Sequence, residues 1–156
     1  MTQTSPAPVT GQDIGVAARA TRAVLEVLLT EEGTDFLTWA ALNTLATSGG
    51  AMAPGALEER LTAGIGADGP SIAAILDRLG AAGLVREAPG QAGAAGAVRL
   101  ELTPDGQALH QRLRAGIARL TARLHDGLDP DDLATTRRVL LEVAERANAA
   151  LAARDR

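Results

Sequence analysis

A pair of short β-strands in an otherwise helical pattern is the feature that most limits the folds open to this chain. Val98, Leu100 and Leu102 alternate with charged side chains, and Leu84-Val85 precede them across the glycine-rich run PGQAGAAG at 89–96. Period-two alternation beside a glycine-rich turn is typical of a β-hairpin. The sequence therefore predicts one hairpin, with a flexible tip, inside a mainly α-helical chain.

Three helices are predicted ahead of residue 62. Apolar residues recur at helical spacing over 13–31, which indicates a first amphipathic helix. Asp35 is a suitable N-cap for a second helix that runs to about residue 46. Pro54 suits the first position of a short third helix, where its missing N–H costs no hydrogen bond.

A turn and a fourth helix separate these helices from the hairpin. The run TAGIGADG at 62–69 predicts a turn, because three glycines make continued helix costly. Pro70 and Ser71 open the fourth helix, and Gly83 ends it. Helix, turn, helix and then a hairpin is the order of a winged helix–turn–helix.

Two long helices are predicted after the hairpin. Thr103-Pro104 and Asp129-Pro130 each combine a capping side chain with proline in the first turn. The second of these helices runs to about residue 152. The first is expected to carry one continuous apolar stripe at helical spacing, which consists of Leu109, Leu113, Ile117, Leu120, Leu124 and Leu128.

Three segments resemble the MarR (multiple-antibiotic-resistance regulator) family. DFLTWAALNTLA at 35–46 is similar to the family's second helix, and LDRLGAAGLVRE at 76–87 to the end of its recognition helix. VRLELTPDGQAL at 98–109 resembles the second wing strand and the start of the fifth helix. The resemblance is close over 35–150 and loose over 13–34.

The resemblance implies a mainly α fold: a winged helix–turn–helix with a small β-hairpin wing, bracketed by long N- and C-terminal dimerisation helices. A flexible tail at 1–12 would precede a single domain at 13–156. Within that domain, 53–102 would form the winged helix–turn–helix, and 13–34 and 103–152 the dimerisation helices. The family implies a homodimer that binds double-stranded DNA and responds to a small, often phenolic, effector. The expected function is a ligand-responsive transcriptional regulator, with repression the usual outcome.

The candidate DNA contacts lie on the fourth helix and the hairpin. The start of a helix offers free N–H groups to phosphate, and arginine contacts both phosphate and base edges. Arg78 has an alternative role in pairing with acids on a solvated helix face, and Arg86 and Arg99 have one as ordinary strand charges. The candidate residues are Pro70, Ser71, Ala73, Ala74, Arg78, Arg86 and Arg99.

The charge of this lobe supports a different function. Residues 53–102 carry four arginines and six acidic residues, a net charge of −2. The tip GQAGAAGA is uncharged, whereas the family usually has an Asp followed by Arg or Lys there. Phosphate neutralisation supplies most non-specific DNA affinity. The alternative is therefore a MarR-like scaffold that has lost DNA binding and serves as a small-molecule-binding, protein-interaction or recruited catalytic protein.

The candidate effector contacts are Phe36, Trp39 and His110. A large apolar wall with a polar N–H suits a crevice for an aromatic ligand. The alternatives are core packing for the two aromatic residues and a surface position for His110.

Other chemistries lack a motif. The chain has no cysteine, and its histidines lie 15 residues apart on one predicted helix, so no metal or cofactor is expected. No nucleophile elbow or phosphate-binding loop is present, so no enzyme is expected. Residues 1–12 are unlike a signal peptide, and no apolar run approaches the roughly 18 residues that span a bilayer. A cytoplasmic protein without membrane contact is expected.

Overall fold

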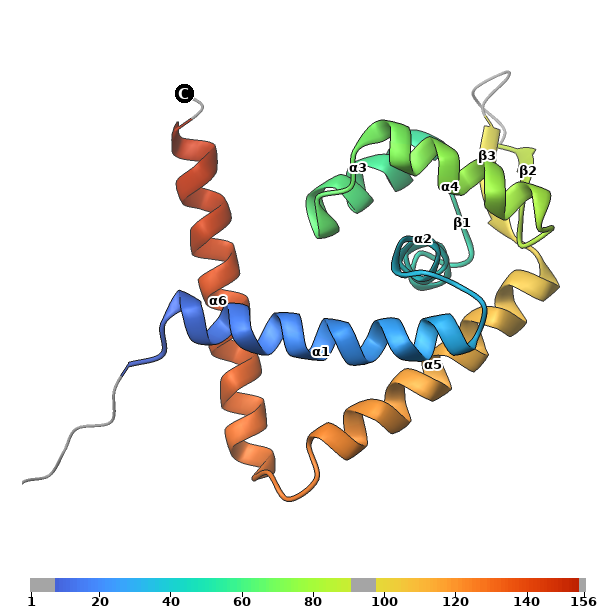
Figure 1. Cartoon of the computed structure of the whole chain (residues 1–156). Helices are drawn as coiled ribbons and strands as arrows, with labels where there is room; N and C mark the ends of the chain where they lie inside the picture. Colours follow the sequence, from blue (N-terminus) through green and yellow to red (C-terminus); the bar gives the residue numbers. More distant parts are fainter. Residues whose placement is uncertain (1–7, 91–97, 155–156) are drawn as a thin grey trace, which may run out of the picture. The chain divides into compact units, whose positions relative to one another are not determined.

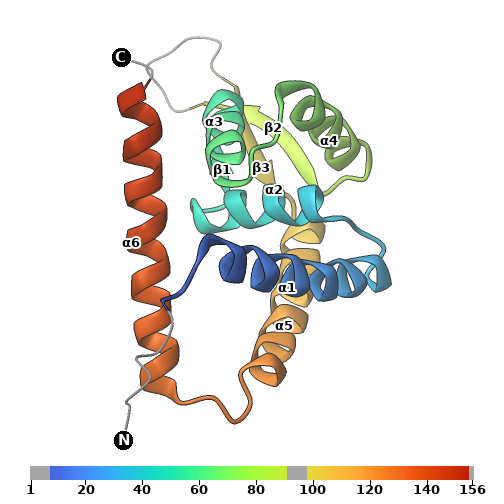
Figure 2. The same ribbon diagram turned by 60° about the vertical axis from the view of Figure 1, so that its left-hand side comes forward.

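The computed structural model describes residues 8–90 and 98–154. In chain order, the described elements are α1 (Gly11–Glu31), α2 (Phe36–Thr47), β1 (Ala51–Met52), α3 (Pro54–Ile65), α4 (Gly69–Ala81), β2 (Val85–Pro89), β3 (Val98–Leu102), α5 (Pro104–Leu124) and α6 (Pro130–Arg154). Figure 1 and Figure 2 show these elements from two sides. The predicted fold class, mainly α with a small antiparallel sheet after a helix–turn–helix, is confirmed. Tertiary contacts divide the chain into two compact units at Arg119–Leu120.

Side-chain caps mark where five of the described helices begin, including α5 and α6. Thr10 and Asp13 form a capping box at the start of α1, and Asp35 accepts a hydrogen bond from the amide of Thr38 in α2. Asp68 caps α4 in the same way through the amide of Ser71. These short acidic and hydroxyl side chains satisfy N–H groups that have no partner within the helix.

Four details of the predicted fold were wrong. The turn expected at 62–69 is shorter, because α3 continues to Ile65 and ends only where Gly66 adopts a left-handed conformation with φ of 67°. The first helix begins at Gly11, two residues before its predicted start at residue 13. Tail residues 1–7 and tip residues 91–97 lie outside the described residues. The stripe expected on one continuous helix is interrupted, since α5 ends at Leu124 and Leu128 follows it.

The fourth correction concerns the sheet, which has three strands rather than two. Its order is β1-β3-β2, and both pairs are antiparallel. Ala51 and Arg86 both lie opposite Glu101, from β1 and β2 respectively. The central strand buries Leu100 and Leu102 on one face. Strand β1 therefore closes the far edge of the hairpin.

The core lies around α2, which contacts α1, α3, α4, β1 and β3. Figure 1 shows α2 nearly end-on, with α1 on one side and α3 and α4 on the other. Gly116 of α5 lies against Leu28 of α1, where an added Cβ would come within 3.1 Å of Leu28 Cδ1. The residues with almost no exposed surface are Leu29, Leu42, Leu45, Leu57, Leu61, Ile72, Ile75, Leu79 and Leu113.

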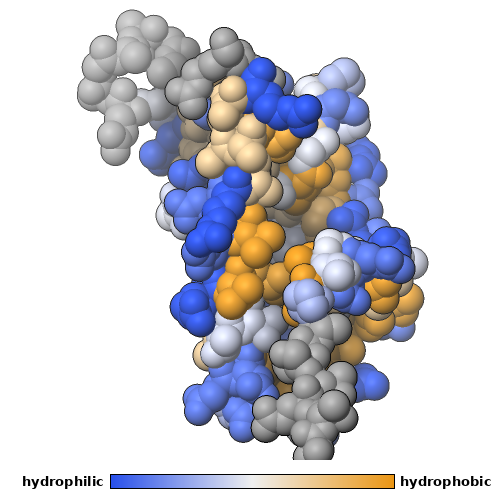
Figure 3. Space-filling view, turned by 90° about the vertical axis from the view of Figure 1, so that its left-hand side faces the viewer, coloured by the Kyte–Doolittle hydropathy of each residue, from blue (hydrophilic) through white to orange (hydrophobic). Residues whose placement is uncertain are grey.

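The second unit consists of the end of α5 and all of α6. None of the side chains in α6 is buried, although apolar residues recur along the helix. The large exposed apolar residues of α6 are Val139, Leu140, Leu141, Val143 and Leu151. Figure 3 views the face that lies on the left in Figure 1 and shows exposed apolar residues in orange beside hydrophilic residues in blue.

Candidate nucleic-acid interface and effector grooves

One face of α4 is buried and the other is open to solvent. Ile72, Ile75 and Leu79 point into the core, at a spacing of three and four residues. All five candidate contacts on this helix are exposed: Pro70, Ser71, Ala73, Ala74 and Arg78. The helix thus presents a face of mostly small side chains, which lets a backbone or a base edge approach closely.

The start of α4 is already occupied by a carboxylate. Asp68 Oδ1 accepts a hydrogen bond of 2.7 Å from the amide of Ser71. That amide and the Ser71 side chain hold the pKa of Asp68 below its usual value, so the carboxylate stays charged. Pro70 has no N–H, so two of the first positions of the helix offer no amide to a phosphate. The anion site expected at this helix start is therefore partly filled by the chain itself.

Arg78 is held by a residue from another helix. Its Nη2 lies 2.9 Å from Oδ2 of Asp35, the N-cap of α2, and both side chains remain largely exposed. Burial of Asp35 raises its pKa, but hydrogen bonds from Thr38 and Arg78 outweigh that effect and leave the pKa lowered. Pairing with an acid was expected within α4, whereas the partner lies 43 residues away.

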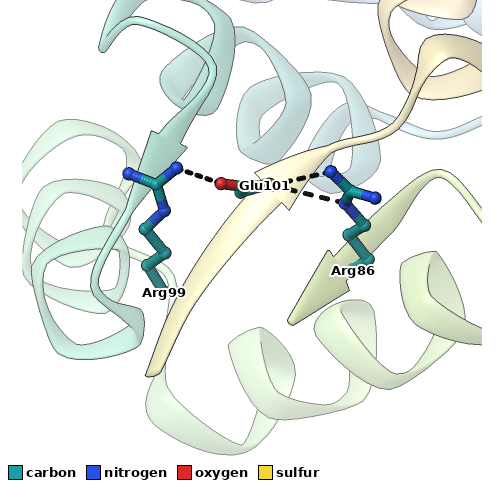
Figure 4. Close-up of polar contacts among 3 residues, drawn as sticks. All are labelled: Arg86, Arg99 and Glu101. Carbon is teal, nitrogen blue, oxygen red and sulfur yellow. Dashed lines mark hydrogen bonds and ion pairs between the residues drawn. The ribbon is translucent and has the colours of Figure 1, made fainter. Parts of the chain in front are cut away.

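The outer face of the sheet carries a three-residue charge cluster. Arg86 donates to Glu101 Oε2 from Nε at 3.3 Å and from Nη2 at 3.1 Å. Arg99 donates from Nη2 to Glu101 Oε1. Figure 4 shows the two guanidinium groups on opposite sides of the single carboxylate. Hydrogen bonds from Arg99 and Arg86 hold the pKa of Glu101 below its usual value.

Acidic side chains of the same chain are paired with most of the arginines of residues 53–102. Arg78, Arg86 and Arg99 all form ion pairs, while Arg60 donates to the hydroxyl of Ser48. Among the residues that the structure describes, three of the four lobe arginines have an acidic partner, and Arg60 is the exception. Less basic charge is therefore free to contact DNA than the net charge of −2 alone indicates.

A first groove, here called the α1–α2 groove, has a volume of about 400 Å³. Arg22 lies over the ring of Phe36, with its guanidinium carbon 3.2 Å from the ring centroid, and pairs with Glu26 at 2.7 Å. The ring of Phe36 thus holds the guanidinium of Arg22 in place, and a guanidinium in a groove can bind a carboxylate. Its lining residues are Arg22, Glu26, Leu29, Thr30, Thr34, Asp35, Phe36 and Leu37.

A second groove, the α2–α4 groove, has a volume of about 360 Å³. It shares Thr34 and Asp35 with the first groove and includes Arg78. The hydroxyl of Thr34 is buried and has no hydrogen-bond partner in the described part of the chain. The other lining residues are Gly33, Thr38, Ile75, Leu79, Ala82, Leu84 and Leu109. Asp35 therefore lines both grooves and also forms an ion pair with Arg78 of α4.

The three predicted effector contacts do not share one groove. Phe36 lines the α1–α2 groove, and Trp39 packs on it with a centroid distance of 5.4 Å. The surface position considered for His110 was wrong. His110 is buried, and its Nε2 lies 3.2 Å from Oδ1 of Asn43 in α2. Burial, and secondarily the charge of Arg114, lower the pKa of His110.

Residues 8–90 and 98–154 contain no group of three or more His, Asp or Glu side chains that could hold a metal ion. None of the helices in those same ranges has the length and apolar character needed to cross a bilayer.

Comparison with solved structures places this arrangement among known folds. The transcriptional regulator PA3341 is 27% identical, with a TM-score of 0.76 over 89% of this chain and 98% of that chain. A MarR variant from E. coli complexed with operator DNA is 22% identical, with a TM-score of 0.70 over 85% and 91% of the two chains. NadR in complex with 4-hydroxyphenylacetate is 21% identical, with a TM-score of 0.69 over 92% and 98%.

The chain has the MarR fold. No protein-family model matches the sequence, and no curated protein is similar enough in sequence to count as a relative. The likeness to these solved structures is one of fold, at 21–27% sequence identity.

Three residues of this MarR fold were missed by sequence reasoning. Arg22 lies within the first predicted helix, where nothing marks it as the neighbour of Phe36. Asp35 was predicted only as a cap, and Glu101 only as one of the lobe's acids. The alternation over 98–102 does place Arg99 and Glu101 on one strand face, which is the one local signal for their pairing.

Proposed function

We propose that this protein is a ligand-responsive DNA-binding transcriptional regulator that acts as a homodimer and represses its target in the absence of effector. The observation that carries the proposal is the exposed face of α4, backed by a buried face and flanked by the hairpin as in the MarR fold. A MarR variant with this fold was solved with operator DNA. The residues proposed to meet DNA remain the seven named from the sequence.

The homodimer is supported by α6, whose apolar side chains are exposed in the single chain. A patch of this kind on a monomeric protein is unusual and marks a contact surface. In a dimer the two α4 helices would enter successive major grooves, about 34 Å apart. Effector binding would shift the spacing of these helices between a DNA-competent and an incompetent state.

The proposed effector is a small aromatic carboxylate. It would bind in the α1–α2 groove, where Arg22 offers a cation beside the face of Phe36. NadR, which has the same fold, was solved with 4-hydroxyphenylacetate. The carboxylate would compete with Glu26 for the guanidinium of Arg22.

Asp35 would carry the signal to the recognition helix. It lines both grooves and is bound to Arg78. An anion bound in the α1–α2 groove would place a second negative charge near Asp35, and this charge would alter the strength of the ion pair between Asp35 and Arg78. The position of Arg78 on α4 would then depend on whether effector is bound.

The test is fluorescence anisotropy of the purified protein with its own upstream intergenic DNA and a scrambled control across a salt series. We expect tighter binding to the upstream DNA and release by 4-hydroxyphenylacetate. Arg22→Gln should bind DNA like the parent but lose the response to effector. Arg19→Gln, one turn earlier on α1 and exposed, removes the same charge and should retain the response. Equal affinity for both DNAs at low salt would contradict the proposal.

A second function is favoured by one specific observation. Three of the four lobe arginines are paired with carboxylates, and Asp68 occupies the amide of Ser71. A MarR-like scaffold without DNA binding, which uses its grooves to bind a small molecule or a protein, would show this pattern. Effector binding by calorimetry, together with no DNA binding even at low salt, would favour it.

A further inference from the structure

The charge cluster on the outer face of the sheet has an arrangement that matters for DNA. Glu101 lies on the central strand directly opposite Arg86, and Arg99 lies two residues before it on the same strand face. The side chain of Glu101 is only 15% exposed, against 68% for Arg86 and 39% for Arg99. The two arginines therefore shield the carboxylate of Glu101 from solvent, and the carboxylate is bonded to both of them.

The contacts in this cluster use the donors that would otherwise meet a phosphate. Arg86 presents Nε and Nη2 together to one oxygen of Glu101, and Arg99 presents Nη2 to the other. The fork of an arginine binds carboxylate and phosphate in the same manner. The Nε–H of Arg99 is buried and has no acceptor among the described residues, so one carboxylate leaves this guanidinium incompletely bonded.

We propose that the carboxylate of Glu101 competes with DNA phosphates for the guanidinium groups of Arg86 and Arg99, and thereby lowers the affinity of the winged helix for DNA. This inference rests on the proposed function. Glu101 acts through the two arginines and is therefore a positioning residue. Because both partners lie on paired strands, the carboxylate is anchored beside them and competes at a high local concentration.

The competition affects sequence-independent binding. Phosphate contacts carry no base information, so freed arginines strengthen binding to any duplex. Each additional neutralised phosphate steepens the dependence of log K on log salt by about 0.9. Two arginines beside one acid contribute one net positive charge to each hairpin rather than two. The result is a regulator that binds its operator weakly enough to be released by a modest effector.

The experiment compares two isosteric substitutions in the same hairpin of the full-length protein. Glu101→Gln removes the carboxylate between the arginines. Glu87→Gln removes the same charge from β2 at an exposed position that takes part in no ion pair within the described ranges. Anisotropy with upstream and scrambled duplexes is measured for each protein from 25 to 300 mM salt, concentrations chosen to bracket the range in which phosphate contacts are lost.

For Glu101→Gln we expect affinity to rise by roughly tenfold at about 100 mM salt on both duplexes, and the salt slope to steepen by about 1 to 2 per dimer. Glu87→Gln should change the slope by less than about 0.5. The double variant Arg86→Gln/Glu101→Gln should lose most of the gain. A gain in affinity cannot arise from a misfolded hairpin, and thermal melting of each variant checks that the fold is kept.

The outcomes separate this inference from the function on which it rests. If the parent binds upstream DNA selectively while the two single variants behave alike, or while Glu101→Gln binds more weakly, the role of Glu101 is overturned and the regulator stands. If none of the proteins binds either duplex at low salt, both proposals fail.

Discussion

Helices α2 and α6 are both rich in apolar residues, yet the chain uses them in opposite ways. In α2, a helix of 12 residues, five side chains are buried, including Leu42 and Leu45 with no exposed surface. In α6, a helix of 25 residues, none is buried. The apolar residues of α2 surround the helix, as in an element that is enclosed by its neighbours. Many of those in α6 recur at helical spacing, as at Leu133, Leu140, Val143 and Leu151, which is typical of a helix with one contact face.

The difference separates two sources of stability. The body around α2 is stabilised by contacts within the chain, so its folding should not depend on protein concentration. In the proposed homodimer the apolar face of α6 contacts a second chain, so its contribution to stability should appear only on association. The effect of a substitution on stability should therefore be independent of protein concentration in the body around α2 and dependent on it in α6.

The largest effect is expected in α2. Leu42→Ala removes a side chain with no exposed surface and should lower the free energy of unfolding by about 2–5 kcal/mol. Leu140→Ala in α6, where the side chain is 40% exposed, should cost under about 1 kcal/mol at low protein concentration. Urea unfolding measures both. Equal losses would remove the distinction between the two regions.

A backbone contact tests the body without changing a large side chain. Gly106 of α5 faces the carbonyl of Leu84, and a Cβ at this position would collide with that oxygen. Gly106→Ala should therefore destabilise the body by about 1–3 kcal/mol. Gly80→Ala in α4 meets no atom within 4 Å and should be stabilising by up to about 1 kcal/mol, because alanine favours helix. Thermal melts that give the same sign for both would contradict this prediction.

The contact face of α6 is tested by charge. Leu140→Glu with Val143→Glu should weaken the proposed dimer at least tenfold, which is about 1.4 kcal/mol, while the circular dichroism of the body stays unchanged. Arg138→Glu lies on the opposite side of the same helix and serves as the control. Light scattering over a concentration series measures the association. A dimer that survives the double substitution would show that α6 is not its interface.

The junction between α2 and α4 should show a smaller effect. Asp35→Ala removes both the cap of α2 and the partner of Arg78, and should cost about 1 kcal/mol. Asp35→Asn can still cap the helix but loses the ion pair, so it should cost about half as much or less, since the pair is exposed. Urea midpoints distinguish the two. A larger loss for Asn than for Ala would contradict the capping role.

The smallest effect concerns pH. Burial lowers the pKa of His110 below its usual 6.5, so the unfolded chain binds a proton that the folded chain resists. The stability contributed by this residue is complete above pH 6.5 and is lost as the pH falls through that value. The urea midpoint should drop between pH 7.5 and 5.5, and His110→Gln, which can still bond to Asn43, should reduce the drop. An unchanged drop would assign it to other groups.

The starts of the helices could be predicted from the sequence because their signals are local. Asp35, Pro54, Pro70 and Thr103-Pro104 each act within one turn of the chain, and the helices begin within a residue or two of the expected positions. Strand β1 has only two residues and no pattern of its own. It exists because β3 offers a free edge, and that edge is a property of the assembled sheet.

The candidate site was less predictable because its contacts span long distances in the sequence. Arg78 meets Asp35 across 43 residues, and His110 meets Asn43 across 67. Composition predicted an acidic lobe, but it did not show that the acids are bound to the arginines. The burial of His110 depends on how α5 packs on α2, which helical periodicity leaves open.

The two strands that flank Glu101 have a consequence for how such proteins diversify. Ala51 and Arg86 sit opposite the same residue of β3, so the segment between them leaves and rejoins the sheet at one level, with ends about 10 Å apart. Residues 53–84 thus leave and rejoin the sheet at fixed ends, and both of their helices, α3 and α4, contribute buried residues to the core between those ends. Substitutions that preserve the fold must keep the apolar residues that are buried within this segment, which are Leu57, Leu61, Ile72, Ile75 and Leu79. In the proposed regulator, operator preference would therefore change through the outward positions of α4, while the buried positions of the scaffold are kept.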